Sequence, residues 1–66
     1  MKVYVNGEAM ERPAGETLAA LLAALGAGSG RVAALVNDEV VPAAAHATQQ
    51  LADGDRVEIL TFAGGG

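Results

Sequence analysis

Residues 2–11 read KVYVNGEAME, which is the pattern of two short strands joined by a tight turn. The first four residues of this stretch alternate Val with Lys or Tyr, as expected for a strand with one buried face. Asn6-Gly7 follows and favours a type I′ turn, because both central residues of that turn need a positive φ. The chain should then return antiparallel, with Met10 on the buried side. Pro13 ends the second strand because it has no N–H for the ladder.

A helix is expected after this hairpin, because four leucines recur at the spacing of one helical face: Leu18, Leu21, Leu22 and Leu25. We expect this leucine face to be buried in the core rather than to form a groove for a partner. Thr17 is a suitable N-cap for this helix. Gly26 lies where a C′ glycine would end it.

Three more strands are expected after the helix, in residues 32–36, 39–41 and 56–62. Residues 43–50 are expected to be irregular, with room for one short helical turn. Asp53 and Asp55 flank Gly54, and we interpret them as turn residues rather than as a catalytic carboxylate pair.

These elements predict a single α+β domain in which one helix covers one face of one sheet. The last strand should lie parallel beside the first and be reached through a crossover connection. This is the β-grasp, or ubiquitin-like, fold. We expect a mixed sheet of four to five strands in the order 2-1-5-3-4, counted along the chain, with the helix across its concave face. The domain is expected to span residues 1–62, and residues 63–66 to form a flexible glycine tail.

The composition excludes several classes of function. The 66 residues include 8 acidic and 4 basic residues, for a net charge of -4, with one Tyr, one Phe and no Trp. This argues against binding to nucleic acid or to an anionic membrane surface. The absence of Cys excludes a disulfide framework, a thiolate metal site and a cysteine nucleophile.

We therefore expect no bound metal or cofactor, and no enzyme active site in so short a chain. His46 stands alone and is expected to be a solvated loop residue rather than a metal ligand or a base. No apolar run approaches the ~20 residues that span a bilayer, and no signal-peptide pattern is present. A cytoplasmic protein is expected.

The chain ends on Gly64-Gly65-Gly66, directly after the last expected strand. Glycine has no side chain to pack and loses much backbone entropy when it is ordered. One interpretation is a frayed end or an expression remnant. The other is a thin stalk that carries a reactive carboxylate on Gly66 into a narrow channel. In that interpretation the protein is not an enzyme, because its own C-terminus is the reacting group.

Further motifs occur in a fixed order along the chain: VNGE at residues 5–8, GETL at 15–18, VNDEVVP at 36–42, LADGDRVEI at 51–59 and the pair Gly65-Gly66. In this respect the whole chain resembles the β-grasp sulfur carrier proteins, which are bacterial relatives of ubiquitin. The closer match is to the ThiS family, the carriers of thiamine thiazole synthesis.

The resemblance implies a mechanism for the tail. In this family a ubiquitin-activating-type adenylyltransferase uses ATP to adenylate the terminal carboxylate. A sulfur donor, supplied by a cysteine desulfurase or a sulfurtransferase, then converts it to a thiocarboxylate, which delivers sulfur to thiazole synthase. Gly65 and Gly66 match the family's diglycine, and Gly66 would carry the sulfur. Gly64 departs from the pattern, because the family more often has a larger residue there.

An apolar docking surface is expected beside the tail. If Val57 and Ile59 face the helix, the alternation of a strand places Leu60 and Phe62 on the open face of the sheet. Tyr4 lies outward on the neighbouring strand by the same argument. We expect Tyr4, Leu60 and Phe62 to form one partner-binding patch, although scattered exposed apolar groups are also common. Leu35 is a further candidate.

Three alternatives to a thiamine-pathway carrier stay open at this point. The first is the small subunit of molybdopterin synthase, which has the same chemistry and a different acceptor. The second is a ubiquitin-like modifier that forms isopeptide bonds with lysines. The third is a binding module whose glycine tail is inert.

Overall fold

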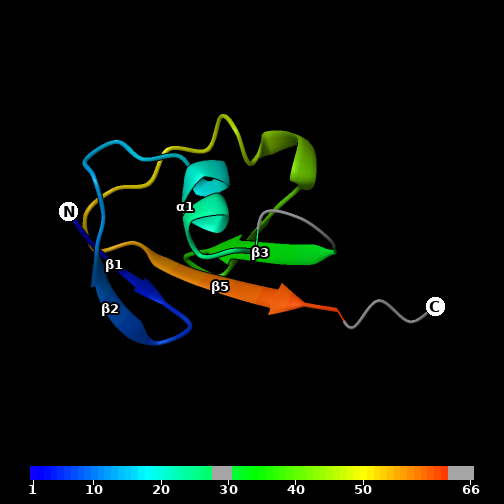
Figure 1. Cartoon of the computed structure of the whole chain (residues 1–66), viewed down its shortest axis with the longest axis horizontal. Coiled ribbons are helices and arrows are strands. Elements are labelled where there is room, and N and C mark those ends of the chain that lie inside the picture. The colour runs from blue at the N-terminus through cyan, green and yellow to red at the C-terminus, as the bar shows by residue number, and fades with distance from the viewer. Residues whose placement is uncertain (28–30, 63–66) are drawn as a thin grey trace.

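The protein is described here by a computed structural model, in which residues 1–27 and 31–62 are placed. Its elements in chain order are β1 (Lys2–Val5), β2 (Glu8–Glu11), α1 (Leu18–Ala24), β3 (Val32–Val36), β4 (Glu39–Val41), the 3₁₀ turn η1 (Ala43–Ala45) and β5 (Arg56–Thr61). Within these residues the strands form one five-stranded sheet in the order β2-β1-β5-β3-β4. Strand β1 is parallel to β5, and the other pairs are antiparallel. The predicted β-grasp topology is confirmed, and α1 lies over one face of the sheet (Figure 1).

The N-terminal hairpin forms as its sequence predicts. Asn6 has a φ of 49° and Gly7 a φ of 85°, the two positive values that a type I′ turn requires. Val3 pairs with Met10 across the hairpin. Val3 is fully buried and Met10 packs against the core, so the alternation places the expected side chains inward.

Helix α1 begins and ends at the predicted caps. The Thr17 hydroxyl accepts a hydrogen bond from the Ala20 amide at 3.2 Å, and Gly26 has a φ of 75°. Leu18, Leu21 and Leu22 are buried against the sheet, but Leu25 is 40% exposed. The expectation that all four leucines share the buried face is wrong at Leu25, because the helix ends at Ala24 and the chain turns away at this position.

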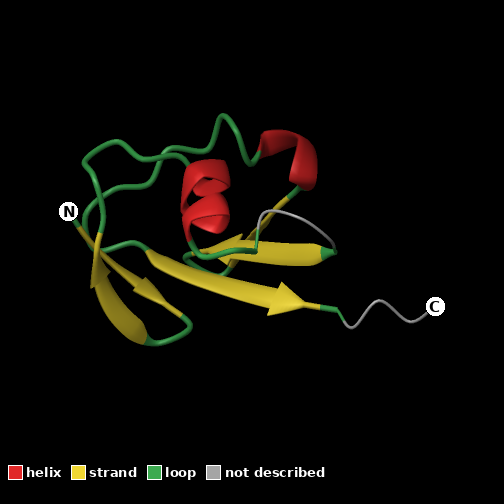
Figure 2. Cartoon of the chain, viewed as in Figure 1, coloured by secondary structure: helices red, strands yellow, loops and turns green. Residues whose placement is uncertain are grey.

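The core is formed mainly by side chains of α1 and of the sheet, the two layers that Figure 2 shows facing each other. Its buried members are all apolar: Val3, Val5, Leu18, Leu21, Leu22, Ala34, Val36, Val41, Leu51 and Val57. Among the described residues no polar or charged residue is buried. None of the helices in residues 1–27 and 31–62 is long and apolar enough to cross a membrane.

An ion pair holds the loop between β2 and α1. The Arg12 guanidinium donates two hydrogen bonds to the Glu16 carboxylate, at 2.7 and 2.6 Å. These bonds, aided by the opposite charge, hold the pKa of Glu16 below its ordinary value even though partial burial opposes the shift. The Glu16 carbonyl also accepts a hydrogen bond from the Leu51 amide at 2.9 Å, so this loop is tied to the segment before β5.

The segment between β4 and β5 contains the predicted short helical turn and the predicted tight turn. Asp53 accepts a hydrogen bond from the Lys2 amide at 2.7 Å, and Asp55 accepts one from the Ala52 amide at 2.8 Å. Both aspartates therefore stabilise the turn around Gly54, as expected.

His46 lies in a turn, as expected, but the expectation that it is solvated is only partly met. Its ring is half-buried, and Nε2 lies 2.9 Å from the Val41 carbonyl oxygen, to which it must donate. The His46 carbonyl accepts a hydrogen bond from the Ala19 amide at 2.9 Å. Through these two hydrogen bonds, His46 connects the turn that follows η1 to β4 and to α1.

Candidate functional site

The glycines predicted to carry the chemistry, Gly64, Gly65 and Gly66, lie outside the described residues. Phe62 is the last residue that the structure describes. What the structure shows is therefore the base of the predicted site, which is the second half of β5 and the surfaces around it.

Strand β5 extends beyond the hairpin on one of its two sides. On the β3 side it is paired from Val57, opposite Val36, to Thr61, opposite Val32. On the β1 side, within the part of the chain that the structure describes, only Arg56 and Val57 have strand partners. Figure 1 shows β5 continuing past the turn of the hairpin toward the C-terminus. The last residues of β5 thus project from a sheet that supports them on one side.

Beyond the end of β1, the side chain of Asn6 hydrogen-bonds to β5 in place of a strand partner. Its Oδ1 accepts a hydrogen bond from the Ile59 amide at 2.8 Å, and its Nδ2 donates one to the Ile59 carbonyl at 3.3 Å. One amide side chain thereby satisfies both main-chain groups of Ile59, as a further residue of β1 would. Sequence reasoning identified Asn6 only as a turn residue and missed this second role.

A second asparagine holds the beginning of β5. Asn37 has a φ of 50°, its Oδ1 accepts from the Arg56 amide at 3.0 Å, and its Nδ2 donates to Asp55 Oδ1 at 3.0 Å. Both asparagines occupy left-handed positions in turns, where Asn is tolerated. The signal in the sequence was the pair of turn motifs, Asn6-Gly7 and Asn37-Asp38, although their partners on β5 were not foreseen.

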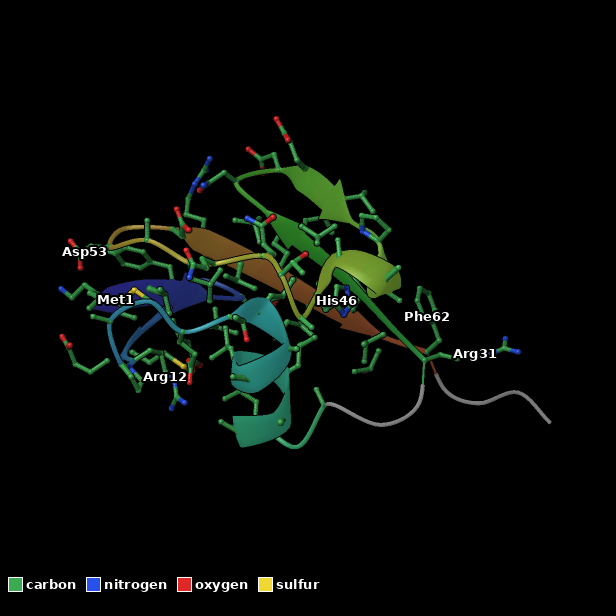
Figure 3. All side chains as sticks on the ribbon, turned by 90° about the horizontal axis from the view of Figure 1, so that it is seen from above. Met1, Arg12, Arg31, His46, Asp53 and Phe62 are labelled. Atoms are coloured by element: carbon green, nitrogen blue, oxygen red, sulfur yellow. The ribbon has the colours of Figure 1, made fainter. Side chains whose placement is uncertain are left out.

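The predicted faces of β5 are confirmed. Val57 is 1% exposed and Ile59 packs against the core from a half-buried position. Leu60 is 50% and Phe62 57% exposed on the opposite face, which α1 does not cover. Figure 3 shows Phe62 at the end of the sheet, next to Arg31. The Phe62 amide donates to the Arg31 carbonyl at 3.2 Å.

Tyr4 does not join these two residues, and the expected three-residue cluster is wrong. Tyr4 is 37% exposed on the open face, but its partner in the register is Arg56. Leu60 and Phe62 lie further along β5 by about 13 and 20 Å, at roughly 3.3 Å per residue. Tyr4 instead lines a separate shallow hollow of about 370 Å³ with Gly7, Gly54, Arg56 and Glu58 among its other walls.

The neighbours of Leu60 on the open face come from β3 instead, and β4 extends this surface on the far side of β3. Ala33 is opposite Leu60, and Leu35 is opposite Val40, which is 70% exposed. The alternation places these side chains on the open face, because Ala34, Val36 and Val41 are buried on the other. We call this surface the open-face patch: Ala33, Leu35, Val40, Leu60 and Phe62. It ends at the last described residue, Phe62, which Ala63 separates from the glycines.

No group of three or more potential metal ligands occurs among residues 1–27 and 31–62. The surface at the end of β5 exposes apolar side chains, among them Leu60 and Phe62, together with main-chain groups. Such a surface suits contact with another protein.

Comparison with known proteins connects this geometry to one family. The model of the ThiS family matches residues 3–66. A crystal structure of a thiamine biosynthesis protein (ThiS) from Geobacter metallireducens superimposes with a TM-score of 0.84 at 33% identity, covering all of both chains. A solution structure of a thiamine biosynthesis protein from Geobacter metallireducens gives a TM-score of 0.77 at 36% identity, covering all of this chain and 88% of that one.

Two curated relatives are named thiazole synthase. The protein of Paramagnetospirillum magneticum is 44% identical and that of Magnetococcus marinus 38% identical, each over 66 residues. In both cases the match covers all of this chain and 20% of the relative. The chain therefore spans about a fifth of the length of these relatives.

Proposed function

The chain belongs to the ThiS family, and from this premise we propose that it is a sulfur carrier of thiamine biosynthesis. The observation that carries the proposal is the match of residues 3–66, which includes the glycine end, together with a fold that follows a ThiS protein over its whole length. In this function the protein is a carrier and not an enzyme. The carboxyl group of Gly66 is the reacting group, and the proposal requires that it be free.

The chemistry needs activation, because a carboxylate anion is a poor electrophile. A ubiquitin-activating-type adenylyltransferase binds ATP, the Gly66 carboxylate attacks its α-phosphate, and pyrophosphate leaves. A persulfide from a cysteine desulfurase or a sulfurtransferase then attacks the acyl carbon, and AMP leaves. A thiol cleaves the resulting S–S bond and releases the thiocarboxylate on Gly66. The carrier itself needs no cofactor, and because ATP is required, the cytoplasm is the expected place of action.

The glycines suit this role because they lack side chains. A chain of Gly64, Gly65 and Gly66 can enter a narrow channel, and a nucleophile can approach the Gly66 carbonyl without meeting a Cβ. The third glycine, Gly64, lengthens this bare segment relative to the usual family pattern.

The open-face patch is the proposed docking surface for the partner enzymes. It brings Leu60 and Phe62 next to the residues that must enter the enzyme, and exposed apolar surface of this kind marks interaction sites. Tyr4 faces the same side of the sheet but lies outside the patch, beside its own hollow.

Thiazole synthase is the proposed sulfur acceptor. The two relatives that carry this name contain a segment similar to the whole of this chain. This favours thiazole synthesis over molybdopterin synthesis, and no observation favours a protein modifier or an inert tail.

ATP–pyrophosphate exchange catalysed by the adenylyltransferase tests the proposal. The full chain should support exchange, whereas a chain without Gly65 and Gly66, or with one residue added after Gly66, should not. All three should melt at nearly the same temperature if these glycines contribute only to the chemistry. Exchange that survives removal of the two glycines would refute the assignment of Gly66.

A further inference from the structure

The second half of β5 has an uncovered main-chain edge. In an antiparallel pair, residues alternate between those that hydrogen-bond to the partner strand and those that point away from it. The Phe62 amide bonds to Arg31 of the β3 side, so the main-chain groups of Thr61 point to the opposite side. Val57 shares this orientation, since its carbonyl accepts a hydrogen bond from the Asn6 amide at 2.9 Å.

Along this edge of β5, as far as the structure describes the chain, the first main-chain groups have hydrogen-bonding partners and the last ones have none. Val57 is paired with β1, and Ile59 is paired with the side chain of Asn6. Among residues 1–27 and 31–62, no strand pairs with Thr61 on this side and no hydrogen bond reaches its N–H or C=O there. The edge therefore becomes available at the residue just before Phe62.

The two outer edges of the sheet are protected in ways that this edge is not. Strand β2 carries Glu8 and Glu11, and β4 has only three residues, begins with Glu39 and is followed by Pro42. Charges, short strands and prolines are the usual protection against pairing with another chain. Residues 59–62 read ILTF and contain none of these.

We propose that the Thr61 edge pairs with an extended segment of the adenylyltransferase that activates Gly66, and so adds a strand to the sheet. This inference rests on the proposed function and deepens it. Binding by strand addition uses main-chain hydrogen bonds for affinity, with side-chain contacts on either face. The open-face patch supplies one such face through Leu60 and Phe62.

Chain length argues for this occupant. Thr61 is five residues before Gly66, so even a fully extended chain places its edge within about 18 Å of the carboxyl group. An enzyme that encloses Gly66 must therefore lie against the end of β5. Main-chain recognition also suits a segment whose last four residues have no side chain larger than a methyl group.

Hydrogen exchange measured by NMR tests the proposal without any substitution. In the free protein the Thr61 amide should exchange faster than those of Leu60 and Phe62, which face β3. With the adenylyltransferase bound, exchange at Thr61 should slow by about tenfold or more.

Two variants test the same point by affinity. Thr61→Pro removes the edge N–H but no hydrogen bond to β3, so the sheet should tolerate it. It should weaken binding to the adenylyltransferase by about tenfold or more. The matched control Thr61→Ala keeps the N–H and should bind within about threefold of the wild type. If Thr61→Pro fails to fold, the exchange measurement decides.

The outcomes separate this inference from the function on which it rests. If Gly66 is adenylated while exchange at Thr61 stays unchanged on binding, the edge inference is wrong and the carrier function stands. If protection at Thr61 grows with protein concentration in the absence of enzyme, the occupant is a second copy and the proposal is overturned. If the enzyme neither binds nor adenylates the chain, both proposals fail.

Discussion

Replacing Asn6 should destabilise the domain through Ile59, although neither the core nor the hairpin register is touched. Asn6 makes two hydrogen bonds to the Ile59 main chain, at 2.8 and 3.3 Å, in an exposed position. Each is worth about 0.5–1.5 kcal/mol net, and exposure to water favours the lower end. Asn6→Gly removes both bonds and tolerates the positive φ, so we expect a loss of about 1–2 kcal/mol.

Two further variants separate the contributions at this position. Asn6→Ala removes the same bonds and must also adopt a φ near 49°, which adds roughly 1 kcal/mol. Asn6→Asp keeps an acceptor for the Ile59 amide but loses the donor and places a carboxylate beside the Ile59 carbonyl. It should therefore retain part of the stability that Asn6→Gly loses.

Thermal melting and hydrogen exchange measure the effect. For a domain of this size, 1 kcal/mol corresponds to about 4–8 °C in Tm, so Asn6→Gly should melt about 5–15 °C lower. The Ile59 amide should exchange faster in Asn6→Gly, by more than the global loss of stability explains. If Asn6→Gly melts like the wild type and Ile59 is still protected, Asn6 does not hold β5 as we infer.

Three other substitutions test the core, the docking surface and the ion pair. Leu21→Ala opens a cavity under α1 and should cost about 2–5 kcal/mol in chemical denaturation, with no direct effect on partner binding by the folded fraction. Phe62→Ala should leave Tm nearly unchanged and weaken binding to the adenylyltransferase by about 2 kcal/mol, roughly thirtyfold, in a titration; a large drop in Tm would instead place Phe62 in the core. Because Arg12 lowers the pKa of Glu16, this pair stabilises the fold above the ordinary Glu pKa and loses its effect as the pH falls through the lowered value. Melting curves from about pH 6 to about pH 3 should therefore show a smaller loss of stability in Glu16→Gln than in the wild type, and parallel losses would contradict this role.

The parts of the fold that local signals determine were predictable. Asn6-Gly7 is nearly sufficient for a type I′ hairpin, and Thr17 and Gly26 mark the two ends of α1. A strand that lies parallel to β1 must be reached through a crossover connection. This requirement favours β5, the last strand, as the neighbour of β1 in the sheet. The inward and outward faces of β5 follow from alternation alone.

The errors concern positions that long-range geometry determines. Tyr4 faces outward as parity requires, but only the register of β1 against β5 shows that it lies beside Arg56 and far from Phe62. His46 has no distinctive sequence context, and its half-buried position depends on how η1 folds back onto β4 and α1.

The role of Asn6 toward Ile59 was missed for a related reason. These residues are 53 positions apart in the sequence. Their hydrogen bonds form because β5 extends beyond the end of β1, so that Ile59 has no β1 residue opposite it. Strand lengths set such a mismatch, and no local pattern encodes it. The open-face patch likewise needed two registers, β4 against β3 and β3 against β5, before Leu35 and Val40 could be placed on the same surface as Leu60.

The central claim is that Gly66 carries sulfur, and intact-mass analysis tests it most directly. The protein is incubated with ATP, the adenylyltransferase and a sulfur donor, and then weighed and fragmented. We predict a gain equal to the exchange of one oxygen for sulfur, located on Gly66 and absent without ATP. An unchanged mass with active enzymes, or a modification on any other residue, would contradict the account.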